Sequence, residues 1–216
     1  GAIFFASEFF EPLVPQLKEN GFPFVNINFP SSSSPTNVYL DIEAGYAEAV
    51  EYLLKQGRKR IGFCIEPSQL HSKNIMKVLR NILDRYDLFQ EDNILTAKDE
   101  AKLRKLADQD AFRNLDAVFC LNDTMAYQLH RELKYKGIRV PQTLSIIGYD
   151  NNPAYPHLST IAIPRTTMAE KAVELLIGHL EGRVKLNKCK GIKVASYFIN
   201  RTTTDGEISS GKADEK

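Results

Sequence analysis

Two pairs of polar residues near the middle of the chain have types and spacing that could hold a small ligand: Asn122-Asp123 and Asp150-Asn151. Each pair follows a short apolar run with β-branched or aromatic members, which is typical of a buried strand. Because ligands bind at the carboxyl ends of strands in an open parallel sheet, we expect the two pairs to lie on one edge. Amide and carboxylate groups with no Lys among them suit a neutral polyhydroxy or amide-bearing ligand better than a phosphate.

The same residues also fit a purely structural role. Asp123 is a good N-cap for the helix predicted by the apolar residues that recur at steps of three and four between positions 125 and 133. The sequence Asn151-Asn152-Pro153 is typical of a turn. The pattern alone therefore leaves a ligand site and simple capping as two open interpretations.

The elements around these residues predict a strand, a crossover helix and a parallel strand between positions 115 and 147. Gly137 and Pro141 stand where a helix must end. Strands alternate with amphipathic helices along the rest of the chain, which indicates the α/β class with parallel sheets. The other predicted strands lie at about 2–6, 22–28, 38–40 and 61–65, and the other main helices at about 41–57, 70–86 and 166–180.

Composition excludes several classes of protein. The chain has 216 residues, 43% hydrophobic and 25% charged residues and a net charge of +1, as in ordinary soluble globular proteins. A domain that binds DNA by itself usually carries a basic stripe, and the short run Arg58-Lys59-Arg60 fits a solvated turn better. No apolar run approaches the ~20 residues of a membrane span, and we expect no membrane partner.

The positions of cysteine and histidine predict no metal site, and the absence of catalytic motifs predicts no cofactor and no enzymatic activity. The three cysteines, Cys64, Cys120 and Cys189, are far apart, and the first two lie in apolar runs typical of core thiols. The four histidines are scattered, with no pair at metal-ligand spacing in the sequence. No nucleophile elbow, phosphate-binding loop, dinucleotide fingerprint or zinc-protease motif is present.

Several stretches, in order, resemble one family. LNDTMAYQLHRELKYKGIRVPQTLSIIGYDN (121–151), followed by LSTIAIPRTTMAEKAVELL (158–176), resembles the effector-binding core of the LacI/GalR family of bacterial transcriptional repressors. VYLDIEAGYAEAVEYLLKQGRKRIGFC (38–64) is similar to an earlier segment of that core. KVASYFINRTT (193–203) is similar to its closing strand, with Arg201 at the family's terminal arginine. The resemblance covers the chain from about Gly1 to Thr203.

The resemblance implies the type I periplasmic-binding-protein architecture: two Rossmann-like parallel-sheet lobes with three crossovers and a ligand cleft between them. The N-terminal lobe is expected to be incomplete, because the family's DNA-binding head and first lobe elements would precede Gly1. We expect residues 1–30 and 161–189 to form this partial lobe and residues 31–160 and 190–203 to form the C-terminal lobe. Residues 204–216 are polar and without periodicity, which predicts a disordered tail.

The resemblance also implies which residues bind the effector. Asn122 and Asp150 match cleft positions that the family uses to hydrogen-bond sugars or nucleobases, and Asn28 falls where many members carry an Asp. The family's usual Arg early in the helix after strand 61–65 is replaced by Ile75. Lys73 or Asn74 could substitute there, and we take Lys73 as the candidate, although Lys lacks the bidentate fork of Arg. Simple loop capping is the alternative for all four residues, above all for Asn28 and Lys73.

The function implied is effector binding and dimerisation in a LacI/GalR-type transcriptional regulator of the cytoplasm. The expected partners are a sugar-like or nucleoside-like effector, a second copy of the chain, and operator DNA reached only through an N-terminal head absent from this sequence. The alternative is a periplasmic or surface solute-binding protein of a sugar transporter, which shares the two-lobe cleft.

Overall fold

A computed structural model describes residues 1–5, 11–27, 37–66, 68, 70–188 and 191–205. The chain divides into two compact units. Unit 1 contains Gly1–Asp41 and Pro164–Ser196, and unit 2 contains Ile42–Ile163 and the segment from Tyr197 onward. The chain therefore passes three times from one unit to the other, and each unit is built around its own, mainly parallel sheet. The predicted α/β class with parallel sheets is confirmed.

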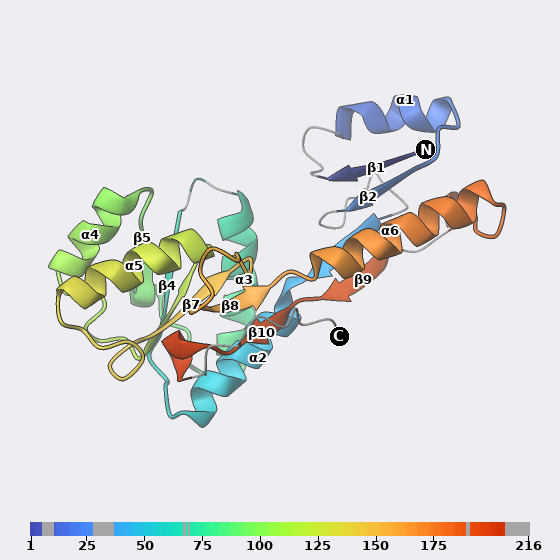
Figure 1. Ribbon diagram of the computed structural model, residues 1–216. Helices are drawn as coiled ribbons and strands as arrows, with labels where there is room; N and C mark the ends of the chain where they lie inside the picture. Colours follow the sequence, from blue (N-terminus) through green and yellow to red (C-terminus); the bar gives the residue numbers. More distant parts are fainter. Residues whose placement is uncertain (6–10, 28–36, 67, 69, 189–190, 206–216) are drawn as a thin grey trace. The chain divides into compact units, whose positions relative to one another are not determined.

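Unit 1 contains a four-stranded parallel sheet with the order β1-β2-β3-β9 (Figure 1). Alternate residues of β1 and β2 point to opposite faces. On one face Phe4 and Phe24 pack with Val14 of α1, and the other face is covered by α6. The element bounds are β1 Ala2–Phe5, α1 Val14–Glu19, β2 Phe24–Ile27, β3 Asn37–Asp41, α6 Arg165–Leu180 and β9 Ile192–Ala195, with short 3-10 turns at Glu11–Leu13 and Leu186–Lys188.

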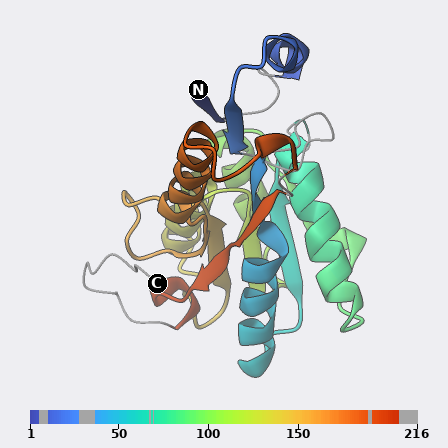
Figure 2. The same ribbon diagram turned by 90° about the vertical axis from the view of Figure 1, so that its right-hand side faces the viewer.

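Unit 2 contains a six-stranded sheet with the order β10-β8-β7-β6-β4-β5, parallel throughout except for β10, which is antiparallel to β8. Helices α4 and α5 cover one face of this sheet, and α2 and α3 lie side by side on the other (Figures 1 and 2). The bounds are α2 Ile42–Lys55, β4 Ile61–Ile65, α3 Leu70–Asp84, β5 Ile94–Thr96, α4 Glu100–Asp108, β6 Ala117–Cys120, α5 Asp123–Tyr135, β7 Ser145–Tyr149, β8 Ser159–Ala162 and β10 Tyr197–Ile199, with 3-10 turns η2 Glu91–Asn93 and η4 Thr202–Thr204.

The unit boundaries differ from the predicted lobe boundaries because of two strand pairings. β3 pairs with β2 and β9, so unit 1 extends to Asp41 rather than ending at residue 30. The predicted single strand 193–203 is split at Ser196, whose amide and hydroxyl groups both donate to the Asp41 carbonyl, at 2.9 and 2.7 Å. Residues 193–196 of the predicted strand therefore belong to unit 1, and residues 197–203 belong to unit 2.

The prediction that residues 204–216 form a disordered tail is wrong for Thr204. Thr204 is buried in η4, where its hydroxyl donates to Asn200 at 2.6 Å and hydrogen-bonds Ser159 at 2.5 Å. Residues 206–216 lie outside the described residues. No helix within the described ranges combines the length and apolar character needed to cross a bilayer.

The basic run 58–60 serves the fold of unit 2. The Arg58 guanidinium donates to the carbonyls of Asp116 and Pro141, at 3.1 and 2.7 Å. Arg60 forms an ion pair with the Asp116 carboxylate at 2.6 Å. The run therefore joins the start of β4 to the segments before β6 and β7.

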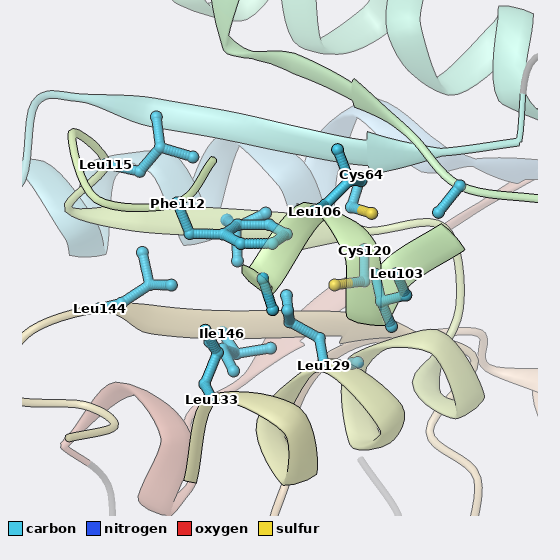
Figure 3. Close-up of a cluster of buried hydrophobic side chains, with 14 of the residues drawn as sticks. Cys64, Leu103, Leu106, Phe112, Leu115, Cys120, Leu129, Leu133, Leu144 and Ile146 are labelled. Carbon is cyan, nitrogen blue, oxygen red and sulfur yellow. The ribbon is translucent and has the colours of Figure 1, made fainter. Parts of the chain in front are cut away.

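A cluster of buried apolar side chains fills the space between the sheet of unit 2 and helices α4 and α5 (Figure 3). Cys64 of β4 and Cys120 of β6 are register partners, and Figure 3 shows both thiols within this cluster. Leu129 and Leu133 of α5 are fully buried against them. The predicted apolar face of this helix and the predicted core position of the two thiols are confirmed.

Burial makes both thiols unreactive in the native protein. Desolvation raises the pKa of Cys64 to about 12, and it raises the pKa of Cys120 as well, with further contributions from Cys64 and Asp123. The thiolate is the reactive form of cysteine. We therefore expect that in a Cys189→Ser variant neither Cys64 nor Cys120 reacts with Ellman's reagent under native conditions. Both should react after unfolding in guanidinium. Reaction of either thiol at the rate of a free thiol in the native state would contradict this packing.

Candidate functional site

Asn122 and Asp150 follow the carboxyl ends of two neighbouring parallel strands. β6 ends at Cys120 and β7 at Tyr149, and the two strands pair in register from Ala117 with Ser145 onward. Parallel strands end at the same edge of a sheet, so both residues lie on the carboxyl edge of the sheet in unit 2. This is the edge at which open α/β sheets bind ligands. We call it the ligand edge.

Asn122, rather than Asp123, caps helix α5. Its Oδ1 accepts a hydrogen bond from the Met125 amide at 2.8 Å, and its backbone is extended, as an N-cap requires. The prediction that Asp123 caps the helix is therefore wrong by one residue. The cap bond occupies the side-chain oxygen of Asn122, so its amide nitrogen is the group that could donate to a ligand.

Asp123 has a different role, because its carboxylate fixes the turn that carries Asp150. The carboxylate is buried, and it accepts hydrogen bonds from the Asn152 amide at 2.6 Å and the Thr160 hydroxyl at 2.7 Å. It also lies against Gly148, where an added Cβ would be 2.1 Å from Asp123 Oδ1. Only glycine leaves room for this carboxylate next to β7.

The turn after β7 has an unusual backbone. Asp150 has φ +115° and Asn151 has φ +54°, conformations that non-glycine residues adopt at a cost of order 1–3 kcal/mol. The Asp150 amide donates to the Ile161 carbonyl at 3.0 Å. Arg201 donates to Asn151 Oδ1 at 2.8 Å and to the Leu158 carbonyl at 2.9 Å. The surrounding hydrogen bonds thus hold Asp150 in one position at the ligand edge.

Of the other two predicted site residues, the structure describes Lys73 but not Asn28. Lys73 is exposed in the first turn of α3, the helix that follows β4, so it too lies toward the ligand edge. Its neighbour Ser72 is buried and donates to the Glu66 carbonyl at 2.5 Å. Ile75 is buried in the core, at 2% exposure, and therefore cannot take the place of a ligand-binding Arg. Asn28 lies outside the described residues.

Tyr46 of α2 is a further polar residue near this edge, although the sequence suggested only an apolar helix face. Its ring stacks on Tyr149 with centroids 6.1 Å apart, and its buried hydroxyl has no hydrogen-bond partner among the described residues. Burial, followed by the nearby Tyr149 and Asp150, raises the pKa of Tyr46 well above its ordinary value. Periodicity could not reveal this residue, since a buried phenol and a buried phenyl ring give the same pattern.

Two surface cavities lie elsewhere on unit 2. One, of about 480 Å³, lies between α4 and α5 and is lined by Arg104, Asp108, Arg131, Glu132, Tyr135 and Lys136. The other, of about 390 Å³, lies at the end of α5. Neither is lined by any of the four predicted site residues. Within the described ranges, no group of three or more His, Cys, Asp and Glu residues could hold a metal ion.

The hydrogen bonds of Asp123 predict that replacing this residue strongly lowers the stability of the protein. Asp123→Ala leaves the half-buried Asn152 amide and the buried Thr160 hydroxyl without this acceptor, and each such loss costs about 1–3 kcal/mol. We expect the free energy of unfolding, from urea denaturation, to fall by about 2–4 kcal/mol. Asp99→Ala is the control, because Asp99 accepts one amide hydrogen bond in an exposed N-cap and should cost only about 1 kcal/mol. Equal losses in the two variants would show that Asp123 does not hold the turn.

Comparison with known proteins places this chain in a family. The family of periplasmic binding protein-like domains matches residues 50–204. The HTH-type transcriptional repressor CytR of Escherichia coli (strain K12) is 32% identical over 166 residues, which cover 71% of this chain and 48% of the repressor. The chain thus spans about half the length of this curated relative.

Solved structures show the same fold. A regulatory protein of the LacI family from Chloroflexus aggregans has a TM-score of 0.80 at 26% identity, covering 93% of this chain and 75% of that chain. A LacI family transcriptional regulator from Enterococcus faecium with bound ribose has a TM-score of 0.74 at 23% identity, covering 94% of this chain and 79% of that chain. This chain belongs to the family of periplasmic binding protein-like domains and is an effector-binding domain of the LacI/GalR type.

Proposed function

We propose that this chain is the effector-binding region of a transcriptional regulator and that it binds a small, neutral, sugar-like or nucleoside-like metabolite at the ligand edge. The observation that carries the proposal is the placement of Asn122 and Asp150 on one sheet edge, at the ends of adjacent strands β6 and β7. The strained turn at Asp150 supports it, because such strain is concentrated at functional sites.

The chemistry of the edge favours a hydroxyl-rich ligand. A carboxylate at Asp150 accepts hydrogen bonds from ligand hydroxyl groups, and the Asn122 amide nitrogen donates to ligand oxygens. Ribose bound to the related regulator from Enterococcus faecium is a ligand of this kind.

The regulatory role rests on the relatives. The curated relative named above is a repressor and the similar solved structures are regulators, not transport proteins, which favours gene regulation over solute delivery. We propose that the effector changes operator binding through a DNA-binding head outside this chain, that the regulator is a cytoplasmic homodimer, and that it binds its ligand without chemical conversion. An effector acts in this way only through different affinities for two conformations.

The proposal is tested by calorimetric and thermal-shift screening of the chain against pentoses, hexoses, nucleosides and nucleobases. A ligand that binds only the native state raises the melting temperature by mass action. We expect Asp150→Asn to weaken a binding sugar or nucleoside by about tenfold or more, because a hydrogen bond to a charged group contributes about 1.5–3 kcal/mol. Asn tolerates positive φ, so this substitution keeps the turn intact.

Asn122→Asp is the second variant, because a carboxylate preserves the N-cap bond to Met125 but removes the amide donor. It should leave the melting temperature without ligand unchanged and weaken the same ligand. Asp99→Asn, at the exposed cap of α4, is the matched control and should bind as wild type. A ligand that binds all three variants with wild-type affinity would show that the effector does not contact the ligand edge.

A further inference from the structure

The cavity at the end of α5 has an unusual charge composition. Its volume is about 390 Å³, and three of its lining residues, His130, Lys134 and Arg139, carry basic side chains. The others are Gly137, Ile138, Val140 and Gln142, so none of the lining residues is acidic. The cavity therefore presents two permanent positive charges and a titratable imidazole on a partly apolar wall.

The cations of this cavity differ from those of the neighbouring cavity between α4 and α5. There, Arg104 pairs with Glu132 at 3.2 Å and Lys136 pairs with Asp108 at 2.6 Å. In contrast, neither Lys134 nor Arg139 takes part in an ion pair with a carboxylate of the described residues. The cavity between α4 and α5 thus already contains carboxylates that neutralise its cations, and the lining of the cavity at the end of α5 contains none.

A second imidazole adds to this positive region. His157, from the segment between β7 and β8, lies with its ring centroid 5.6 Å from that of His130, although the two residues are far apart in sequence. Burial, then His157, then Lys134 lower the pKa of His130, and burial and Arg201 lower the pKa of His157. A cation held by the two imidazoles would meet this same positive field, which disfavours a metal ion and favours an anion.

We propose that this cavity is a binding site for the phosphate group of a small metabolite, held by Lys134, Arg139, Gln142 and protonated His130. Arg and Lys donate charge-assisted hydrogen bonds to phosphate oxygens, and the Gln142 amide adds a neutral donor. The C-terminal end of α5 carries a partial negative charge of about half a unit, which the two full positive charges of Lys134 and Arg139 exceed. The amides of Gly137 and Ile138 also pair with carbonyls of its last turn at 3.1 and 3.0 Å.

The site is separate from the ligand edge. Asn122 begins α5 at that edge, and Lys134 stands in its last turn, so the 13-residue helix separates them by about 20 Å. The neutral groups at the ligand edge and the cations at the far end of α5 also select different chemistry. The inference does not depend on the proposed effector, since it concerns a different cavity and a charged ligand.

The test is a titration of the chain with inorganic phosphate at constant ionic strength, followed through the His130 ring signals by NMR. We expect saturable movement of the His130 signals and a rise in the pKa of His130, because a bound anion stabilises its protonated form. Phosphate should accordingly bind more tightly as the pH falls through that pKa. The charged and titratable groups around His130 are Lys134, Arg139 and His157, with Arg201 behind His157.

The double variant Lys134→Gln/Arg139→Gln should weaken phosphate binding by about tenfold or more, since both lost contacts are charge-assisted. Both side chains are exposed, so the unfolding midpoint should not change. Lys55→Gln/Lys77→Gln removes the same charge from exposed sites on α2 and α3 and should bind phosphate as wild type. The proposal is wrong if chloride produces the same His130 shifts as phosphate, or if the two double variants respond alike.

Discussion

A single buried carboxylate organises the part of unit 2 that carries the ligand edge. Asp123 begins α5 directly after β6, and its two oxygens accept from the turn after β7 and from Thr160 of β8. Three consecutive strands of the sheet are thereby joined at one point, and Gly148 is required beside it. A buried carboxylate is expensive unless its hydrogen bonds are satisfied. The turn is consequently held in a backbone conformation that it would not adopt alone.

The sequence allowed much of this fold to be predicted, because periodicity records which faces are buried. The strand, helix and strand around α5, the end of that helix at Gly137 and the core thiols are confirmed. The prediction was wrong where a choice depended on neighbours distant in the chain. Asn122 and Asp123 are both good caps in isolation, and only the Asn152 amide and Thr160 hydroxyl decide that Asp123 is used elsewhere.

Other features had no signal in the sequence for the same reason. Ser196 breaks a predicted strand because it donates to Asp41, a residue 155 positions away. His130 and His157 meet because a helix and a loop pack together, and no local spacing encodes that contact. Of the predicted ligand residues, Asn122 and Asp150 share one sheet edge by topology, whereas the part that Lys73 plays in ligand binding stays a prediction.

The interleaved order of the two units has a consequence for synthesis on the ribosome. β3 of unit 1 pairs with β9, and the two strands are separated in the chain by nearly all of unit 2. Likewise, β8 of unit 2 pairs with β10, which follows much later in the chain. The Arg201 side chain, which anchors the Asp150 turn, follows β10. Neither unit can close its sheet until the last part of the chain has emerged. Long-range pairings of this kind form slowly, and they leave strand edges exposed to other chains in the meantime.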